Sequence, residues 1–112
     1  MANTVTLNGR FIHIVFDGAT KWDVLADIVP LRPEAVGGIK VKSLHAKAAA
    51  SDDVLTVRDI LNAGTSGPVM FDNKFTSEYD TRDKDFGDGK ICFPSIVGTE
   101  ATSGVKLTIE LA

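Results

Sequence analysis

The residues that could do chemistry in this chain are few and widely spaced. Among 112 residues there are two histidines, His13 and His45, and a single cysteine, Cys92. His45 could serve as a general base if Asp52 or Asp53 oriented it, because a serine nucleophile needs such a pair. None of the serines lies in the G-x-S-x-G elbow that exposes a nucleophile in many hydrolases. We therefore predict no catalytic residues and no enzymatic activity, with a small hydrolase built on His45 as the enzymatic alternative.

Neither a metal site nor a cofactor site is predicted. One cysteine and two histidines in separate segments cannot supply the ligands of a zinc site. Residues 80–89 do cluster carboxylates, as a calcium loop does. Counted from Asp83, however, the EF-hand pattern meets Gly87 where a ligand belongs, Asp88 where glycine belongs and Pro94 in place of glutamate. We expect both histidines and the cysteine, which lie in or beside apolar runs, to be structural residues.

Composition and charge exclude several classes of partner. Twelve basic and fifteen acidic residues give a formal charge of -3, and the lysines and arginines form no basic stripe. Binding to nucleic acid by phosphate neutralisation is therefore not expected. No run approaches the roughly 20 apolar residues that span a membrane, and the N-terminus lacks the pattern of a secretory signal. We expect a protein that binds no membrane and is made in a reducing compartment.

Apolar periodicity predicts a chain built from strands. Residues 105–111 alternate apolar and polar, and residues 39–44 do the same with lysines on the outer face, as in half-buried strands. Residues 11–16 are apolar on both faces, which favours a central strand between packed sheets. The remaining candidate strands are residues 5–7, 54–58, 69–71 and 90–97. In the last of these, Pro94 should mark a bulge or a sheet edge.

One segment, residues 21–29, fits a helix and a strand equally well by its apolar spacing. We predict extended structure there, because Pro30 and Pro33 would stop a helix soon after it began. Together these patterns predict one β-rich domain over residues 1–112. The fold class is all-β: an antiparallel β-sandwich or jelly-roll-like fold with six to eight short strands and at most one short helix.

Residues 72–89 concentrate the charge of the chain, with six acids and three bases, whereas the rest of the chain is neutral. The segment shows no sustained period, which predicts a long exposed connection between strands. Three aromatic residues interrupt it: Phe75, Tyr79 and Phe86. They could fold over the core as a lid, or they could anchor a partner, since aromatics ringed by polar groups often form interface centres. The sequence leaves both interpretations open.

Four strand segments carry a resemblance to a known family: GIKVKSL at 38–44, DVLTVR at 53–58, GPVMF at 67–71 and GVKLTIEL at 104–111. In these, residues 37–111 resemble small virion proteins of tailed bacteriophages, in particular β-sandwich capsid decoration or cement proteins. The resemblance implies a non-enzymatic structural protein on the capsid surface, assembled in the bacterial host cytoplasm. Its partners would be the major capsid protein and copies of itself, as a homotrimer or another small homo-oligomer.

We expect attachment through the acidic aromatic segment and through residues 30–38. The candidate contact residues are Leu31, Arg32, Phe75, Tyr79, Arg82 and Phe86. Deletion of residues 75–86 should then spare folding and weaken attachment. Two alternatives use the same fold: a head–tail or tail structural component, and a carbohydrate- or receptor-binding module. The second of these would stack its ligand on Trp22, Tyr79 and Phe86.

Overall fold

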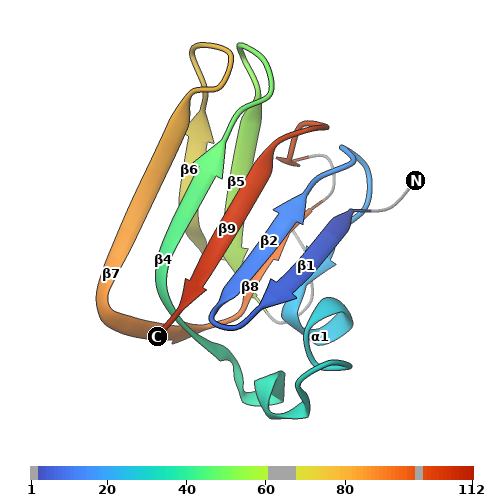
Figure 1. The fold of residues 1–112 in the computed structure, drawn as a ribbon, viewed down its shortest axis with the longest axis vertical. Coiled ribbons are helices and arrows are strands. Elements are labelled where there is room, and N and C mark those ends of the chain that lie inside the picture. Colours follow the sequence, from blue (N-terminus) through green and yellow to red (C-terminus); the bar gives the residue numbers. More distant parts are fainter. Residues whose placement is uncertain (1–2, 61–67, 98–99) are drawn as a thin grey trace.

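Two antiparallel β-sheets pack face to face in the computed structural model, which describes residues 3–60, 68–97 and 100–112 (Figure 1). One sheet has the strand order β1-β2-β9-β4-β7, and the other has the order β3-β8-β5-β6. The strands are β1 Thr4–Asn8, β2 Phe11–Val15, β3 Trp22–Asp23, β4 Ile39–Lys47, β5 Val54–Asp59, β6 Val69–Lys74, β7 Thr81–Cys92, β8 Pro94–Ile96 and β9 Lys106–Leu111. This arrangement confirms the predicted all-β sandwich, although one of the nine described strands, β3, has only two residues.

The core lies between the sheets, where apolar side chains from both form one cluster. On β9, Leu107 and Ile109 are fully buried, as the predicted alternation requires. On β2, Ile12 and Ile14 are buried, but Phe11 and Val15 keep 36% of their surface exposed. β2 is therefore an interior strand of its sheet, between β1 and β9, as predicted, but it is buried on one face only, because the outer face of its sheet has no second layer against it.

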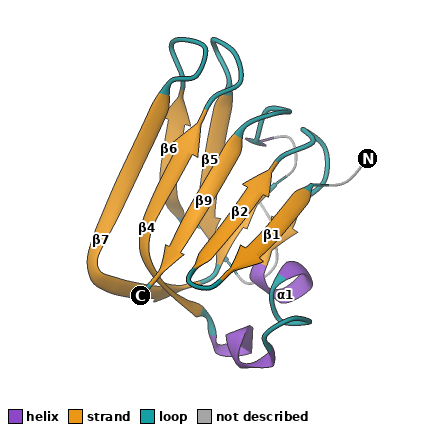
Figure 2. Ribbon diagram, viewed as in Figure 1, coloured by secondary structure: helices purple, strands orange, loops and turns teal. Residues whose placement is uncertain are grey.

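Two short helices lie at one end of the sandwich (Figure 2). Helix α1, Val24–Asp27, follows β3 directly, and the 3₁₀ helix η1 spans Pro33–Gly37. The prediction of extended structure over residues 21–29 is correct only for β3. The Asp27 carboxylate accepts the backbone N–H of Asp23 at 2.9 Å, and the Ile28 N–H reaches the Val24 carbonyl at 3.0 Å, so one helical turn is complete before Pro30.

The predicted loop over residues 72–89 is wrong, because most of it is strand. β6 continues to Lys74 and β7 begins at Thr81, so only residues 75–80 connect them. β7 is an edge strand that pairs with β4 alone and exposes charged side chains, which removes the apolar alternation that reveals a strand. A bulge adds to the irregularity, since the register shifts between Val41 and Ser43, and Gly87 and Gly89 take positive φ angles of 65° and 113° beside it.

The chain passes from one sheet to the other between Cys92 and Pro94. β7 ends in the five-stranded sheet, and β8 begins at Pro94 in the four-stranded sheet between β3 and β5. Pro94 therefore marks a change of sheet, where the sequence predicted a bulge or an edge. The backbone at Phe93 is satisfied on both sides: its N–H donates to Asp59 Oδ1 at 2.9 Å, and its carbonyl accepts the Ile60 N–H at 3.1 Å.

Candidate functional site

The outer face of the five-stranded sheet carries polar side chains in two rows that cross the strands. Ser43 and His45 are two residues apart on β4 and therefore point to the same face. The register places His45 between Asp83 on β7 and Thr108 on β9. It places Ser43 between Asp85 on β7 and Glu110 on β9. Strand pairing alone thus gathers these six side chains from three strands.

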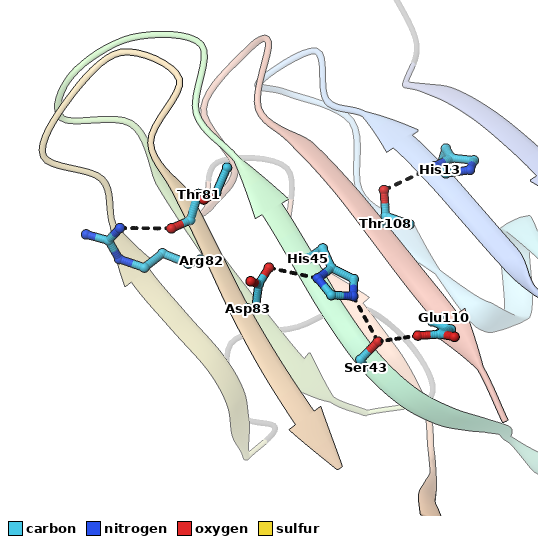
Figure 3. A network of polar contacts seen from close by, with 8 residues as sticks. All are labelled: His13, Ser43, His45, Thr81, Arg82, Asp83, Thr108 and Glu110. Atoms are coloured by element: carbon cyan, nitrogen blue, oxygen red, sulfur yellow. Dashed lines mark hydrogen bonds and ion pairs between the residues drawn. The ribbon is translucent and has the colours of Figure 1, made fainter. Parts of the chain in front are cut away.

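Four of these side chains form a continuous chain of hydrogen bonds (Figure 3). His45 Nδ1 lies 2.7 Å from Asp83 Oδ1, and His45 Nε2 lies 3.0 Å from Ser43 Oγ. The Ser43 hydroxyl in turn lies 2.9 Å from Glu110 Oε1. We call these four residues the polar chain. It borders an open hollow of about 480 Å³, which is lined by Lys42, Ser43, His45, Asp83, Lys84, Asp85 and Glu110.

The protonation state of His45 sets the direction of the bonds in the polar chain. A carboxylate only accepts, so Nδ1 must carry the hydrogen that bonds to Asp83. When His45 is neutral, Nε2 accepts the hydroxyl hydrogen of Ser43. When Nε2 is also protonated, it donates to Ser43 Oγ, and the hydroxyl hydrogen turns to Glu110. The proton on His45 Nε2 therefore decides whether the Ser43 hydroxyl donates its hydrogen bond to His45 or to Glu110.

The distances from Ser43 through His45 to Asp83 match those of a nucleophile, a base and an orienting carboxylate. Two features oppose catalysis. Ser43 is only 7% exposed, and it lies between two paired strands, β7 and β9. Neither carboxylate of the enzymatic alternative orients His45: Asp53 Oδ2 accepts the backbone N–H groups of residues 49 and 50 at 2.9 Å, and Asp52 lies near Lys74.

A second candidate surface lies at the end of the sandwich that carries the helices. Leu31, Val36 and Ile91 are 64%, 59% and 68% exposed there. Gly38, with φ of 101°, brings η1 against the end of β7, where an added Cβ would come within 3.2 Å of the Ile91 side chain. A mostly apolar hollow of about 190 Å³ lies beside η1, with Ile28, Ala35, Ile39 and Leu111 among its lining. We call Leu31, Val36 and Ile91 the apolar end.

Two of the six predicted contact residues lie at or beside this end. Leu31 belongs to it, whereas the Arg32 guanidinium donates to the carbonyl of Gly9 at 2.9 Å and holds the segment against the hairpin of β1 and β2. Phe75, in contrast, is completely buried in the core. Phe75 is therefore not a contact residue, and deleting residues 75–86 would remove a core side chain and half of β7.

The other three predicted residues have different surroundings. Tyr79 is exposed in the turn before β7, with Lys47 Nζ 5.3 Å from its ring centre. Arg82 binds Asp80 and lies over the Phe75 ring at 6.0 Å. Phe86 is partly buried against the core. The three aromatic residues therefore differ in role. Phe75 belongs to the core and Phe86 covers it, so Tyr79 alone of the three has a ring exposed for contact with a partner.

Trp22 and Cys92 are both buried, and neither can meet a ligand at the surface. Trp22 is completely buried, so it is not a stacking platform for a carbohydrate. Burial raises the pKa of the Cys92 thiol to about 11, which keeps the thiol protonated at neutral pH and confirms the prediction of a buried cysteine. Within the described ranges, no cluster of three or more His, Cys, Asp or Glu residues could hold a metal ion, and no helix is long and apolar enough to cross a membrane.

Sequence reasoning missed Ser43 and Asp83 as neighbours of His45, and Glu110 as a neighbour of Ser43. The only local signal was the spacing of Ser43 and His45 on one strand.

No protein-family model matches this chain, and no curated protein sequence matches it significantly.

Proposed function

We propose that this protein is a non-enzymatic virion structural protein of the capsid decoration type, which binds a major capsid protein through the apolar end. The observation that carries the proposal is the exposure of three large aliphatic side chains, Leu31, Val36 and Ile91, at one end of the sandwich. Large aliphatic side chains left exposed beside a well-formed core can mark a surface that a partner covers. The resemblance to phage decoration proteins supplies the kind of partner.

Charged groups around the apolar end fit an interface with an apolar centre and a polar rim. Arg32, Glu34 and Lys40 line the adjacent hollow together with its apolar residues. Burying the apolar end against a partner would stabilise the complex by about 1.5–3 kcal/mol for each fully covered side chain. A head–tail or tail component could use the same surface. Separating phage particles into heads and tails and finding which of them holds the protein would distinguish these locations.

The test compares two regions of the molecule with matched substitutions. Leu31→Asp and Ile91→Asp together should reduce occupancy on capsids at least about 30-fold, the effect of losing about 2 kcal/mol at an interface centre. The control is Tyr79→Asp, which adds a charge at an exposed residue. Tyr79 precedes the first residue of β7 and Ile91 is next to its last, so this long strand separates the two positions (Figure 1).

Occupancy is measured by sedimentation with capsids assembled from the major capsid protein of the same phage. The Tyr79→Asp variant should sediment with capsids as wild type does, whereas the double variant should stay in the supernatant. Unchanged occupancy of the double variant contradicts the proposal. Circular dichroism of each variant separates a lost contact from a lost fold.

A second candidate function, ester hydrolysis, is favoured by one observation: the 3.0 Å and 2.7 Å contacts that join Ser43, His45 and Asp83. Ser43 Oγ would attack an ester carbonyl while its proton passes to His45 Nε2. The leaving alcohol would take that proton as the acyl–serine ester forms. Water, deprotonated by His45, would then release the acid and restore Ser43.

This second candidate is tested with p-nitrophenyl acetate. Release of p-nitrophenolate that falls about 1,000-fold in Ser43→Ala and in His45→Ala supports hydrolysis, since triad members act as a unit. Thr108→Ala, which changes a neighbour of His45 outside the polar chain, serves as the control. A wild-type rate equal to buffer, or a rate that Ser43→Ala leaves unchanged, excludes it.

A further inference from the structure

The edge strands of the two sheets differ in how well they are protected against pairing with another chain. β7 carries charges and a bulge, both of which oppose edge pairing. β6 has its Met70 carbonyl occupied by Lys84 Nζ at 2.8 Å. β3 has only two residues. β1 is the exception: five residues, Thr4–Asn8, without a charge, a proline or a bulge.

The backbone of β1 has hydrogen-bonding groups that face away from the sheet. A two-residue turn joins β1 to β2, and Gly9, its first central residue, has a φ angle of 59°. A type II′ turn requires a positive φ at that position. Residues that flank such a turn exchange hydrogen bonds, so Asn8, Thr6 and Thr4 bond inward to β2. The N–H and C=O groups of Val5 and Leu7 therefore point outward, and within the described part of the chain they pair with no other strand.

We propose that β1 is a homodimer interface, at which two copies pair antiparallel around a twofold axis at Thr6. This register sets Val5 opposite Leu7 of the second copy and Leu7 opposite its Val5. All four outward groups on each strand then find partners in the two hydrogen-bonded pairs. A register centred on Val5 or on Leu7 would overlap fewer residues. The two five-stranded sheets would become one continuous sheet of ten strands.

The side chains of β1 suit a second copy of the same strand. Val5 and Leu7 lie on the inner face, where they pack against the core but keep part of their surface exposed. In the dimer each would cover the other's remaining apolar surface. Thr6 lies on the outer face and would meet the second Thr6 directly, a cross-strand pair that is favourable in sheets. The inference rests on β1 alone and does not depend on the proposed capsid function.

Cysteine cross-linking tests the register. Opposed residues of a pair without backbone hydrogen bonds have Cα atoms about 4.5 Å apart, within the range that a disulfide spans. Thr6→Cys should therefore oxidise to a covalent dimer in air. Thr4→Cys, on the same strand and face, is the matched control, because its two copies would lie roughly 13 Å apart. The buried Cys92 does not interfere. Cross-linking of Thr4→Cys but not of Thr6→Cys overturns the proposal.

Charge substitution tests the same axis without a covalent bond. Thr6→Lys sets two like charges opposite each other and should weaken the dimer at least about fivefold in analytical ultracentrifugation. Thr6→Glu should do the same, and a mixture of the two variants should restore the dimer. Thr81→Lys, on the opposite edge of the sheet, is the control for an added charge. Circular dichroism checks that each variant is folded. Wild-type protein that stays monomeric at about 100 μM overturns the proposal, because the dissociation constant of the dimer would then be too weak for the expected pairing.

Discussion

Two segments that the sequence marks as contact regions have opposite fates in the structure. Residues 72–89 are rich in charge and aromatic residues, yet the fold uses most of them itself: Phe75 fills the core, and Arg82 and Lys84 bind neighbouring groups. The segment of residues 30–38 is shorter and is not rich in charged and aromatic residues, yet its Leu31 and Val36 stay exposed. The difference shows that conspicuous side chains need not stay available at the surface when strand pairing and packing satisfy them internally.

The largest expected effect is a difference in the free energy of unfolding between variants of two aromatic residues within 72–89. Phe75 is fully buried and Tyr79 is exposed. Phe75→Ala should lower the free energy of unfolding by about 3–5 kcal/mol, because it leaves a cavity in the core. Tyr79→Ala should change it by only about 0.5 kcal/mol or less, as exposed substitutions do. Urea denaturation followed by Trp22 fluorescence measures both. Equal losses in the two variants would mean that both rings are packed alike.

A smaller loss is expected where β7 meets β6. Lys84 Nζ donates to the Met70 carbonyl and lies 5.5 Å from the Phe86 ring centre, so this lysine joins the two sheets at their open edge. Lys84→Ala should cost about 1 kcal/mol of stability, the net value of one such bond. Val36→Asp, in the contrasting segment, should change stability by only about 0.5 kcal/mol or less. Urea midpoints measure both changes. The reverse order would mean that residues 30–38 support the fold more than this part of β7 does.

Acid should act on residues 72–89 through Asp80. The bond from the Arg82 guanidinium, followed by that from the Thr76 N–H, holds the pKa of the Asp80 carboxyl below its ordinary value of 3.8. A lowered pKa means that this stabilisation is present above the unfolded value and is lost as pH falls through the folded value. Melting temperatures measured from pH 5 downward should therefore decline less steeply in Asp80→Asn than in wild type. Parallel curves would show that Asp80 does not contribute.

The smallest effect is expected for the polar chain on the outer face. The side chains of His45 and Asp83 are 48% and 65% exposed. Exposed ion pairs contribute little, so His45→Ala should change the free energy of unfolding by only about 0.5 kcal/mol or less at neutral pH. Urea denaturation measures the change. A loss above about 2 kcal/mol would show that the polar chain is a structural element comparable to the core.

Local patterns predicted the strands with an apolar face and missed most of β7, which has none. Residues 105–111 and 39–44 show their period because one face meets the core. β7 lacks that contrast, since charged residues occupy both alternating sets of its positions. The polar chain was beyond local reasoning for another reason. Its contacts join His45 to Asp83 and Ser43 to Glu110, residues 38 and 67 positions apart, which only the strand register brings together.

The passage of the chain from β7 to β8 makes one uninterrupted run of residues a member of both sheets. Residues 81–92 belong to the five-stranded sheet, and Pro94–Ile96 lie inside the four-stranded one. The backbone at Phe93 therefore joins the two sheets directly, in addition to their packed core. The two layers should thus exchange their amide hydrogens as a single cooperative unit.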